Sequence, residues 1–137
     1  MIIRTLTERD LEQIKAIDRA AFPEDDQYEG EMYWQMLQSG VSIVASDDNG
    51  AIVGYAFVQI NAGSRIRSIA VHPDFQRKGY GKAMMRAVID GADREVDLLV
   101  DEANGPAVRL YRSLGFQPVE MCLVPPKRRM LLKTEKS

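Results

Sequence analysis

The chain passes from a strand straight into a helix at residues 76–82, where the sequence reads Gln-Arg-Lys-Gly-Tyr-Gly-Lys. Residues 66–71 before this segment are strand-like, and an amphipathic helix ending near Gly91 is predicted after it. Glycines at such a junction let a ligand come close to the backbone N–H groups, and the positive end of the helix dipole lies at the same place. Three of the seven residues are also basic. The segment therefore has the pattern of an anion site, and the anion it predicts is a phosphate group.

The rest of the sequence alternates between strand and helix patterns and predicts one α/β domain over residues 1–137. Strands are expected at residues 2–6, 41–45, 52–60, 66–71, 96–100, 119–124 and 129–132. Helices are expected at residues 11–21, 32–37, 80–91 and 106–114. The resulting order, β-α-α-β-β-β-α-β-α-β-β, implies a mixed central sheet of about seven strands with four helices.

The charge balance and the metal-binding residue types restrict the classes of partner. The 137 residues contain 18 Lys and Arg against 20 Asp and Glu, for a formal net charge of −2. Nucleic-acid-binding proteins usually carry a basic excess, so that class is disfavoured. A single cysteine excludes an internal disulfide, and with a single histidine it cannot complete the usual set of zinc ligands. We therefore expect no nucleic-acid partner and no metal.

Hydropathy indicates where the protein acts. No apolar run is long enough to cross a membrane. The first residues, Met-Ile-Ile-Arg-Thr, lack the charged-then-apolar layout of a signal peptide. We therefore expect a reducing, cytoplasmic setting and no membrane partner.

Spacing separates the possible phosphate ligands of residues 76–82. A Walker loop needs Gly, four residues and then Gly-Lys-Ser/Thr, but Ala83 follows Gly81-Lys82 and no glycine stands at the required distance before them. A dinucleotide fingerprint needs three glycines early in a βαβ unit, whereas this loop lies past mid-chain. Neither nucleotide motif fits. A simple strand-to-helix turn is the alternative to a ligand site.

Two segments carry a family resemblance. Residues 71–81 read Val-His-Pro-Asp-Phe-Gln-Arg-Lys-Gly-Tyr-Gly, which is Gln/Arg-x-x-Gly-x-Gly/Ala after Val-x-Pro. Downstream, Asn104 precedes Leu-Tyr-Arg-Ser-Leu-Gly-Phe at residues 110–116. In both motifs and in the order of its elements, the chain resembles the GNAT family of acyl-CoA-dependent acyltransferases.

The resemblance implies how acetyl-CoA, the acyl donor, would be held. Strand residues Ile69, Ala70 and Val71 would pair with the pantetheine arm in the gap between two splayed strands, and Asn104 would contact the same arm. Tyr111 would act as general acid and protonate the departing CoA thiolate. Backbone amides would wrap the pyrophosphate along Gln76, Arg77, Lys78, Gly79, Tyr80, Gly81 and Lys82.

The resemblance further implies that a primary amine attacks the thioester directly in a ternary complex, with a strand N–H stabilising the oxyanion. Relatives that acetylate protein N-termini carry a Glu on the fifth strand, and the matching position here is Leu99. This departure leaves the general base open. Asp101 or Glu102 could supply it, and both are equally readable as solvated loop charges.

The acceptor is open between a small-molecule amine and an amine of a peptide or protein. An acidic and aromatic segment could form a rim suited to a cationic amine, or it could be a solvated loop beside core aromatics. Its members are Phe22, Glu24, Asp25, Asp26, Tyr28, Glu29, Glu31, Tyr33 and Trp34.

Loss of the Glu position also keeps a second function open, that of a non-catalytic acyl-CoA-binding regulatory module. The presence of Tyr111 opposes it. Exposed edge strands could pair two copies in a homodimer.

Overall fold

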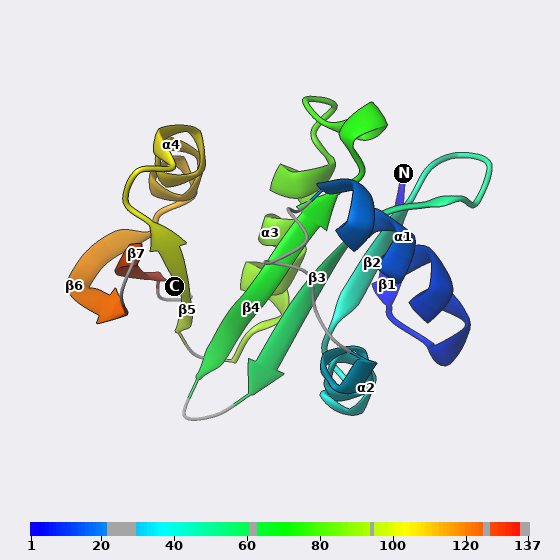
Figure 1. Cartoon of the computed structure of the whole chain (residues 1–137), viewed down its shortest axis with the longest axis horizontal. Coiled ribbons are helices and arrows are strands. Elements are labelled where there is room, and N and C mark those ends of the chain that lie inside the picture. Colours follow the sequence, from blue (N-terminus) through cyan, green and yellow to red (C-terminus); the bar gives the residue numbers. More distant parts are fainter. Residues whose placement is uncertain (22–29, 61–62, 94, 125–126, 135–137) are drawn as a thin grey trace.

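A computed structural model describes residues 1–21, 30–60, 63–93, 95–124 and 127–134. Within these ranges seven strands form one sheet in the order β1-β2-β3-β4-β5-β7-β6 (Figure 1). Strand β4 pairs with β5 in parallel and the other pairs are antiparallel, so the sheet is mixed, as predicted. The strands are β1 (Ile2–Thr5), β2 (Ile43–Ser46), β3 (Ile52–Ile60), β4 (Ser64–Val71), β5 (Val96–Asp101), β6 (Gln117–Val124) and β7 (Lys127–Thr134).

Four α-helices are described, and the order of helices and strands agrees with the prediction. They are α1 (Leu11–Ala21), α2 (Gly30–Gln38), α3 (Tyr80–Gly91) and α4 (Gly105–Ser113), with the 3-10 turns η1 (Glu8–Asp10) before α1 and η3 (Pro73–Phe75) before α3. The last two strands are longer than predicted because backbone pairing extends into polar residues, with Gln117 opposite Lys133 and Thr134 opposite Val96. In the described part of the chain, no helix combines the length and apolar character needed to cross a membrane.

Side-chain alternation along β3 assigns the helices to two faces of the sheet. Tyr55 and Phe57 belong to a buried cluster with α1 and α2, whereas Ala56 and Val58 belong to a cluster with α3. Helix α4 lies on the same face as α3, because Tyr111 packs against the cluster that contains Ala56 and Val58. The sheet therefore has an α1/α2 face and an α3/α4 face.

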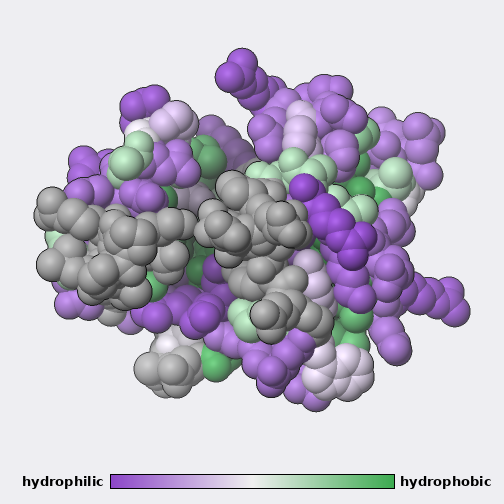
Figure 2. Space-filling view, viewed as in Figure 1, coloured by the Kyte–Doolittle hydropathy of each residue, from purple (hydrophilic) through white to green (hydrophobic). Residues whose placement is uncertain are grey.

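Strands β4 and β5 are joined at one end only. Their parallel ladder has three residue pairs and ends at Ile66 and Leu98. Beyond it, β4 runs on to Val71 with β3 as its partner, and β5 runs on to Asp101 with β7 as its partner. The part of the molecule that holds β5, β6, β7 and α4 stands apart from β4 in Figure 1, and the surface between the two parts is indented at the upper side of Figure 2.

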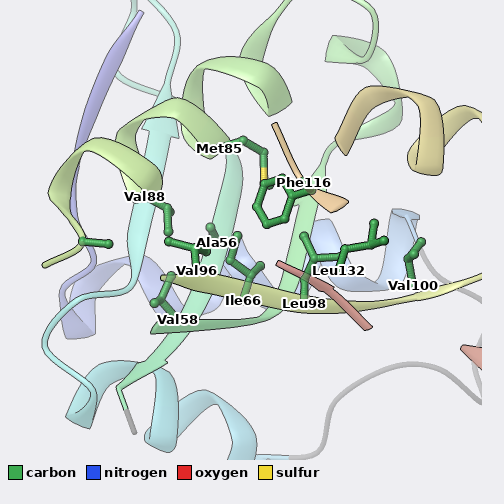
Figure 3. Packing of buried hydrophobic residues seen from close by; sticks show 11 residues of the cluster. Ala56, Val58, Ile66, Met85, Val88, Val96, Leu98, Val100, Phe116 and Leu132 are labelled. Carbon is green, nitrogen blue, oxygen red and sulfur yellow. The ribbon is translucent and has the colours of Figure 1, made fainter. Parts of the chain in front are cut away.

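A single hydrophobic cluster continues beneath this separation and joins the two parts (Figure 3). Its fully buried members include Met85 of α3, Phe116 just before β6 and Leu132 of β7. On the other face, Arg65 and Asp97 form a two-point ion pair beside the end of the ladder, with Nε–Oδ1 at 2.7 Å and Nη2–Oδ2 at 3.2 Å. The ladder end is thus fixed from both faces.

A substitution at Gly54 of β3 tests how closely β4 and α3 pack against this strand. A Cβ at this position would lie 2.8 Å from the carbonyl oxygen of Ala70 and 2.9 Å from Cε of Met84. Because the Ala70 contact is with backbone, we expect Gly54→Ala to lower the free energy of unfolding by about 1–3 kcal/mol in urea denaturation.

Gly91→Ala is the matched control, since a Cβ there meets nothing within 4 Å and the residue ends a helix. It should be neutral or stabilising by about 0.5–1 kcal/mol. Equal effects of the two substitutions would contradict the close approach.

Candidate active site

The segment between β4 and α3 has the backbone geometry of an anion cradle. Arg77 has φ +65° and Gly79 has φ +90°, so two residues in the left-handed region lie within one tight turn. Gly79 is the N-cap of α3, and no side chain of the described residues caps this helix. The N–H groups of the first helical turn are therefore directed at the loop without a protein acceptor, which is the arrangement that binds phosphate.

Side chains of the loop make contacts that hold its conformation, in addition to making it basic. The Gln76 amide donates to the Val71 carbonyl oxygen at 3.0 Å and ties the loop to the end of β4. Lys78 places its Nζ 5.4 Å from the centre of the Phe75 ring, and Tyr80 packs edge-on against the same ring with centroids 6.3 Å apart. The seven predicted residues thus form one continuous segment, residues 76–79 in the loop and residues 80–82 in the first turn of α3. Gln76 and Tyr80 have internal roles in it.

The predicted pantetheine strand lies beyond the point where β4 and β5 part. Ile69, Ala70 and Val71 pair with β3 on one edge. Their other edge would face β5, but the ladder has already ended at Ile66. This leaves backbone groups of residues 69–71 directed into the opening, as pairing with an extended ligand arm requires.

The second motif positions Asn104 and Tyr111 on the opposite side of that opening. Asn104 is exposed and caps α4, with its Oδ1 accepting from the Ala107 N–H at 3.3 Å. Tyr111 is partly buried on α4 and packs edge-on against Phe116, with centroids 6.0 Å apart. Burial raises the pKa of the Tyr111 hydroxyl above its ordinary value, so this group holds its proton at neutral pH.

The end of β5 supplies no obvious base among the described residues. Leu98 and Val100 are buried toward the α3/α4 face, so Leu99 points to the α1/α2 face, where it is 37% exposed. Asp101 accepts the Ala103 N–H at 2.9 Å and shapes the turn into α4. Glu102 is exposed beside it.

The predicted acceptor rim is partly wrong. Tyr33 is only 6% exposed and belongs to the core between α1, α2 and the sheet, so it forms no part of a surface rim. Trp34 is 50% exposed and Glu31 is exposed on the same helix, as a rim requires. The other proposed members, at residues 22–29, lie outside the described residues.

Sequence reasoning missed a buried carboxylate. Asp18 of α1 is 0% exposed and accepts a hydrogen bond from the Tyr55 hydroxyl, which lies 3.2 Å from Ser68 Oγ of β4. Tyr33 lowers the pKa of this carboxyl, whose Oδ2 has no hydrogen-bond partner among the described residues. The available signal was a carboxylate on the apolar face of the first helix, four residues after the fully buried Ile14.

Comparison with known proteins agrees with this geometry. The family model of the acetyltransferase (GNAT) family matches residues 11–116. The N-alpha-acetyltransferase of Sulfurisphaera tokodaii is 31% identical over 87% of this chain and 81% of that protein. The [ribosomal protein bS18]-alanine N-acetyltransferase of Escherichia coli K12 is 36% identical over 50% of this chain, and the match spans about half of that protein (49%). The structure of Arabidopsis thaliana NAA60 in complex with acetyl-CoA superimposes with a TM-score of 0.81 at 22% identity, covering 98% of each chain.

The fold and the family match therefore define an acetyltransferase. The chain belongs to the GNAT acetyltransferase family. Its relatives transfer acetyl groups to amines. In the described part of the chain, no group of three or more His, Cys, Asp or Glu side chains could hold a metal ion.

The left-handed turn of the loop can be tested at Gly79. Alanine at φ +90° is strained by roughly 1–2 kcal/mol, although its Cβ would meet nothing within 4 Å. We expect Gly79→Ala to lower the free energy of unfolding by about that amount. The loop should relax toward another conformation, and acetyl-CoA affinity measured by calorimetry should fall.

Gly50→Ala is the control for this prediction. Gly50 has φ +85° in the turn between β2 and β3, and a Cβ there also meets nothing within 4 Å. The substitution should cost similar stability and leave the Kd for acetyl-CoA unchanged. If both variants bind acetyl-CoA equally well, the loop at residues 76–82 is not the donor site.

Proposed function

We propose that the chain is an N-acetyltransferase that transfers the acetyl group of acetyl-CoA to a primary amine by direct attack in a ternary complex. One observation carries the proposal. The β4–β5 ladder ends at Ile66 and Leu98, with the anion cradle at the end of β4 and Tyr111 across the opening. An extended donor with a phosphate at one end and a thioester at the other fits this arrangement.

The donor and the acceptor would approach from different faces of the sheet. The cradle begins α3, so the pyrophosphate would be held at the end of the α3/α4 face, with the pantetheine arm along Ile69, Ala70 and Val71 and within reach of Asn104. This leaves the α1/α2 face for the amine. Trp34 and Glu31, exposed on α2, support an amine binding from that side.

Bond making and breaking would then proceed as follows. The amine nitrogen attacks the thioester carbonyl carbon, and a β4 backbone N–H stabilises the resulting oxyanion. As the intermediate collapses, the carbon–sulfur bond breaks and the Tyr111 hydroxyl gives its proton to the sulfur. The raised pKa of Tyr111 keeps its hydroxyl protonated until the thiolate departs, and the proton is regained from solvent afterwards.

The acceptor class that the relatives favour is the N-terminal α-amine of a peptide or protein. The Sulfurisphaera relative is an N-alpha-acetyltransferase and the Escherichia coli relative acts on an alanine of ribosomal protein bS18. Glu31 and Trp34, which are exposed on α2, favour a small cationic amine as the second candidate, such as a polyamine.

An acceptor screen tests the function. The purified chain is incubated with acetyl-CoA and one amine at a time: peptides that begin with Ala, Met or Ser, Nα-acetyl-lysine amide, and spermidine. Release of CoA thiol and the mass of the acetylated product are followed. We expect turnover with at least one α-amine peptide. Calorimetric binding of acetyl-CoA without thiol release from any amine would instead support a non-catalytic acyl-CoA-binding module.

Tyr111→Phe tests the general acid. Phenylalanine keeps the ring that packs against Phe116 and removes the proton to be donated. We expect kcat to fall by about 100-fold or more, with acetyl-CoA affinity and the free energy of unfolding nearly unchanged. An unchanged kcat would remove Tyr111 from the chemistry, and a large loss of stability would assign it to packing instead.

A further inference from the structure

Resting on the proposed N-acetyltransferase function, one requirement of the reaction is still without a residue. The attacking amine must lose a proton, yet β5 has Leu99 at the matching position and Asp101 engages a backbone N–H through Oδ1. A group on another element that reaches the opening is a candidate for this proton beside Asp101 and Glu102. The α1/α2 face, from which the amine approaches, is where such a group would be needed.

A chain of hydrogen-bonded side chains crosses that face. Asp18 of α1 is fully buried, and the Tyr55 hydroxyl of β3 bonds to its Oδ1. The same hydroxyl lies 3.2 Å from Ser68 Oγ of β4. Three elements that are distant in the sequence thus contribute one continuous line of oxygens.

The outer end of this line lies at the opening. Ser68 is two residues beyond Ile66, the last residue of β4 to pair with β5. It is opposite Phe57 of β3, which belongs to the α1/α2 cluster, so its side chain is on the face we assign to the amine. Ser68 is also partly exposed, whereas Tyr55 and Asp18 are 0% exposed.

When Asp18 is ionised, the hydroxyl protons of Tyr55 and Ser68 have a single possible direction, toward Asp18. Tyr55 has a single hydroxyl proton, and it is donated to the Asp18 carboxylate. Tyr55 Oη must then accept from Ser68, so the Ser68 proton points inward. The lone pairs of Ser68 Oγ are left to accept a proton from a donor in the opening.

We propose that Ser68, Tyr55 and Asp18 form a proton relay that deprotonates the acceptor amine, with Asp18 as the final acceptor. Before the nitrogen–carbon bond forms, a proton of the acceptor ammonium passes to Ser68 Oγ, the Ser68 proton to Tyr55 Oη, and the Tyr55 proton to the Asp18 carboxylate. The neutral amine then attacks, and the second proton that its nitrogen must lose leaves to solvent as the carbon–sulfur bond breaks. Asp18 becomes a neutral carboxylic acid, and the proton returns to solvent by the reverse route after the product leaves. Ser68 is the member that touches the amine, while Tyr55 and Asp18 act through it.

The surroundings of Asp18 suit this role. The groups that face it among the described residues are Tyr55 from β3 and Tyr33 from α2, with the Lys15 ammonium of α1 placed 5.6 Å from the centre of the Tyr33 ring. Burial raises the pKa of the Asp18 carboxyl, and the hydroxyls of Tyr55 and Tyr33 offset part of this rise. A carboxylate that is reluctant to stay charged is a better proton acceptor than an exposed one.

The same contacts could serve only to fasten α1 and α2 to the sheet, and Tyr33 separates the two roles. Tyr33→Phe removes a hydroxyl that lowers the pKa of Asp18, as Tyr55→Phe does, but leaves the line from Ser68 to Asp18 intact. Tyr33→Phe is therefore the matched control for Tyr55→Phe. Ser68→Ala breaks the line at its exposed end, where a loss of folding is least expected.

The experiment measures kcat/KM for the α-amine peptide that the wild type acetylates, from about pH 6.5 to about pH 9.5, a range that spans the α-amino pKa near 8. Free energies of unfolding and acetyl-CoA affinities of all variants are measured alongside. In Tyr55→Phe and Ser68→Ala we expect a loss of roughly 100-fold near neutral pH that narrows to a few-fold at the alkaline end. At the alkaline end the amine is already neutral and needs no relay to remove its proton. Tyr33→Phe should keep the wild-type shape of the pH profile.

Three outcomes would overturn the relay. Wild-type pH profiles in both Tyr55→Phe and Ser68→Ala would show that the line carries no proton. An equal loss at every pH in Tyr33→Phe and Tyr55→Phe would show that the contacts only hold the helices in place. Binding of acetyl-CoA by the wild type without acetylation of any amine would overturn the proposed function and the relay with it, whereas the first two results leave the function standing.

Discussion

The structure depends on a parallel ladder that stops early. Three residue pairs join β4 to β5, and beyond Ile66 and Leu98 each strand keeps a partner only on its outer side. An unpaired strand edge inside a sheet is normally costly. Here the buried cluster around Phe116 and Leu132 continues beneath the separation and holds the two parts together (Figure 3). Hydrophobic packing thus stabilises an opening that backbone pairing alone would close.

In this arrangement the two faces of the sheet would bind different substrates, the acyl donor and the amine. The α3/α4 face contains the anion cradle and Tyr111, the groups that would deal with the donor and its leaving thiolate. The α1/α2 face contains Ser68, Tyr55 and Asp18, which we assign to the amine. Strand β4 belongs to both, because successive side chains along it alternate between the faces.

Much of the fold could be predicted because its signals are local. The Asn49-Gly50 turn, Pro106 in the first turn of α4 and the glycines of the cradle each mark a boundary within a few residues of sequence. The same locality explains the site residues at 76–82, which lie in one continuous segment from the loop into the first turn of α3. Arg77 at φ +65° was not predictable, because glycine is the residue expected in that conformation.

What escaped prediction is set by contacts between distant segments. Tyr55 is 37 residues from Asp18 and 13 from Ser68, so no spacing rule links the three. The sequence left open whether Tyr33 is a rim or a core aromatic, because periodicity over a nine-residue helix cannot say which side faces the sheet; the structure places it in the core. The register that ends the β4–β5 ladder is also non-local, since the strands pair in parallel across the whole of α3.

Because β4 and β5 are joined at one end only, a small rotation at that end would produce a larger displacement at the other end. From Ile66 to the end of β4 at Val71 is five residues, or about 16 Å of strand. Rotation of the part that holds β5, β6, β7 and α4 about the ladder would displace Tyr111 far more than Leu98, with the Arg65–Asp97 ion pair close to the pivot. A rotation of a few degrees at the joined end would move the far end, where the thioester would meet the amine, by about 1 Å.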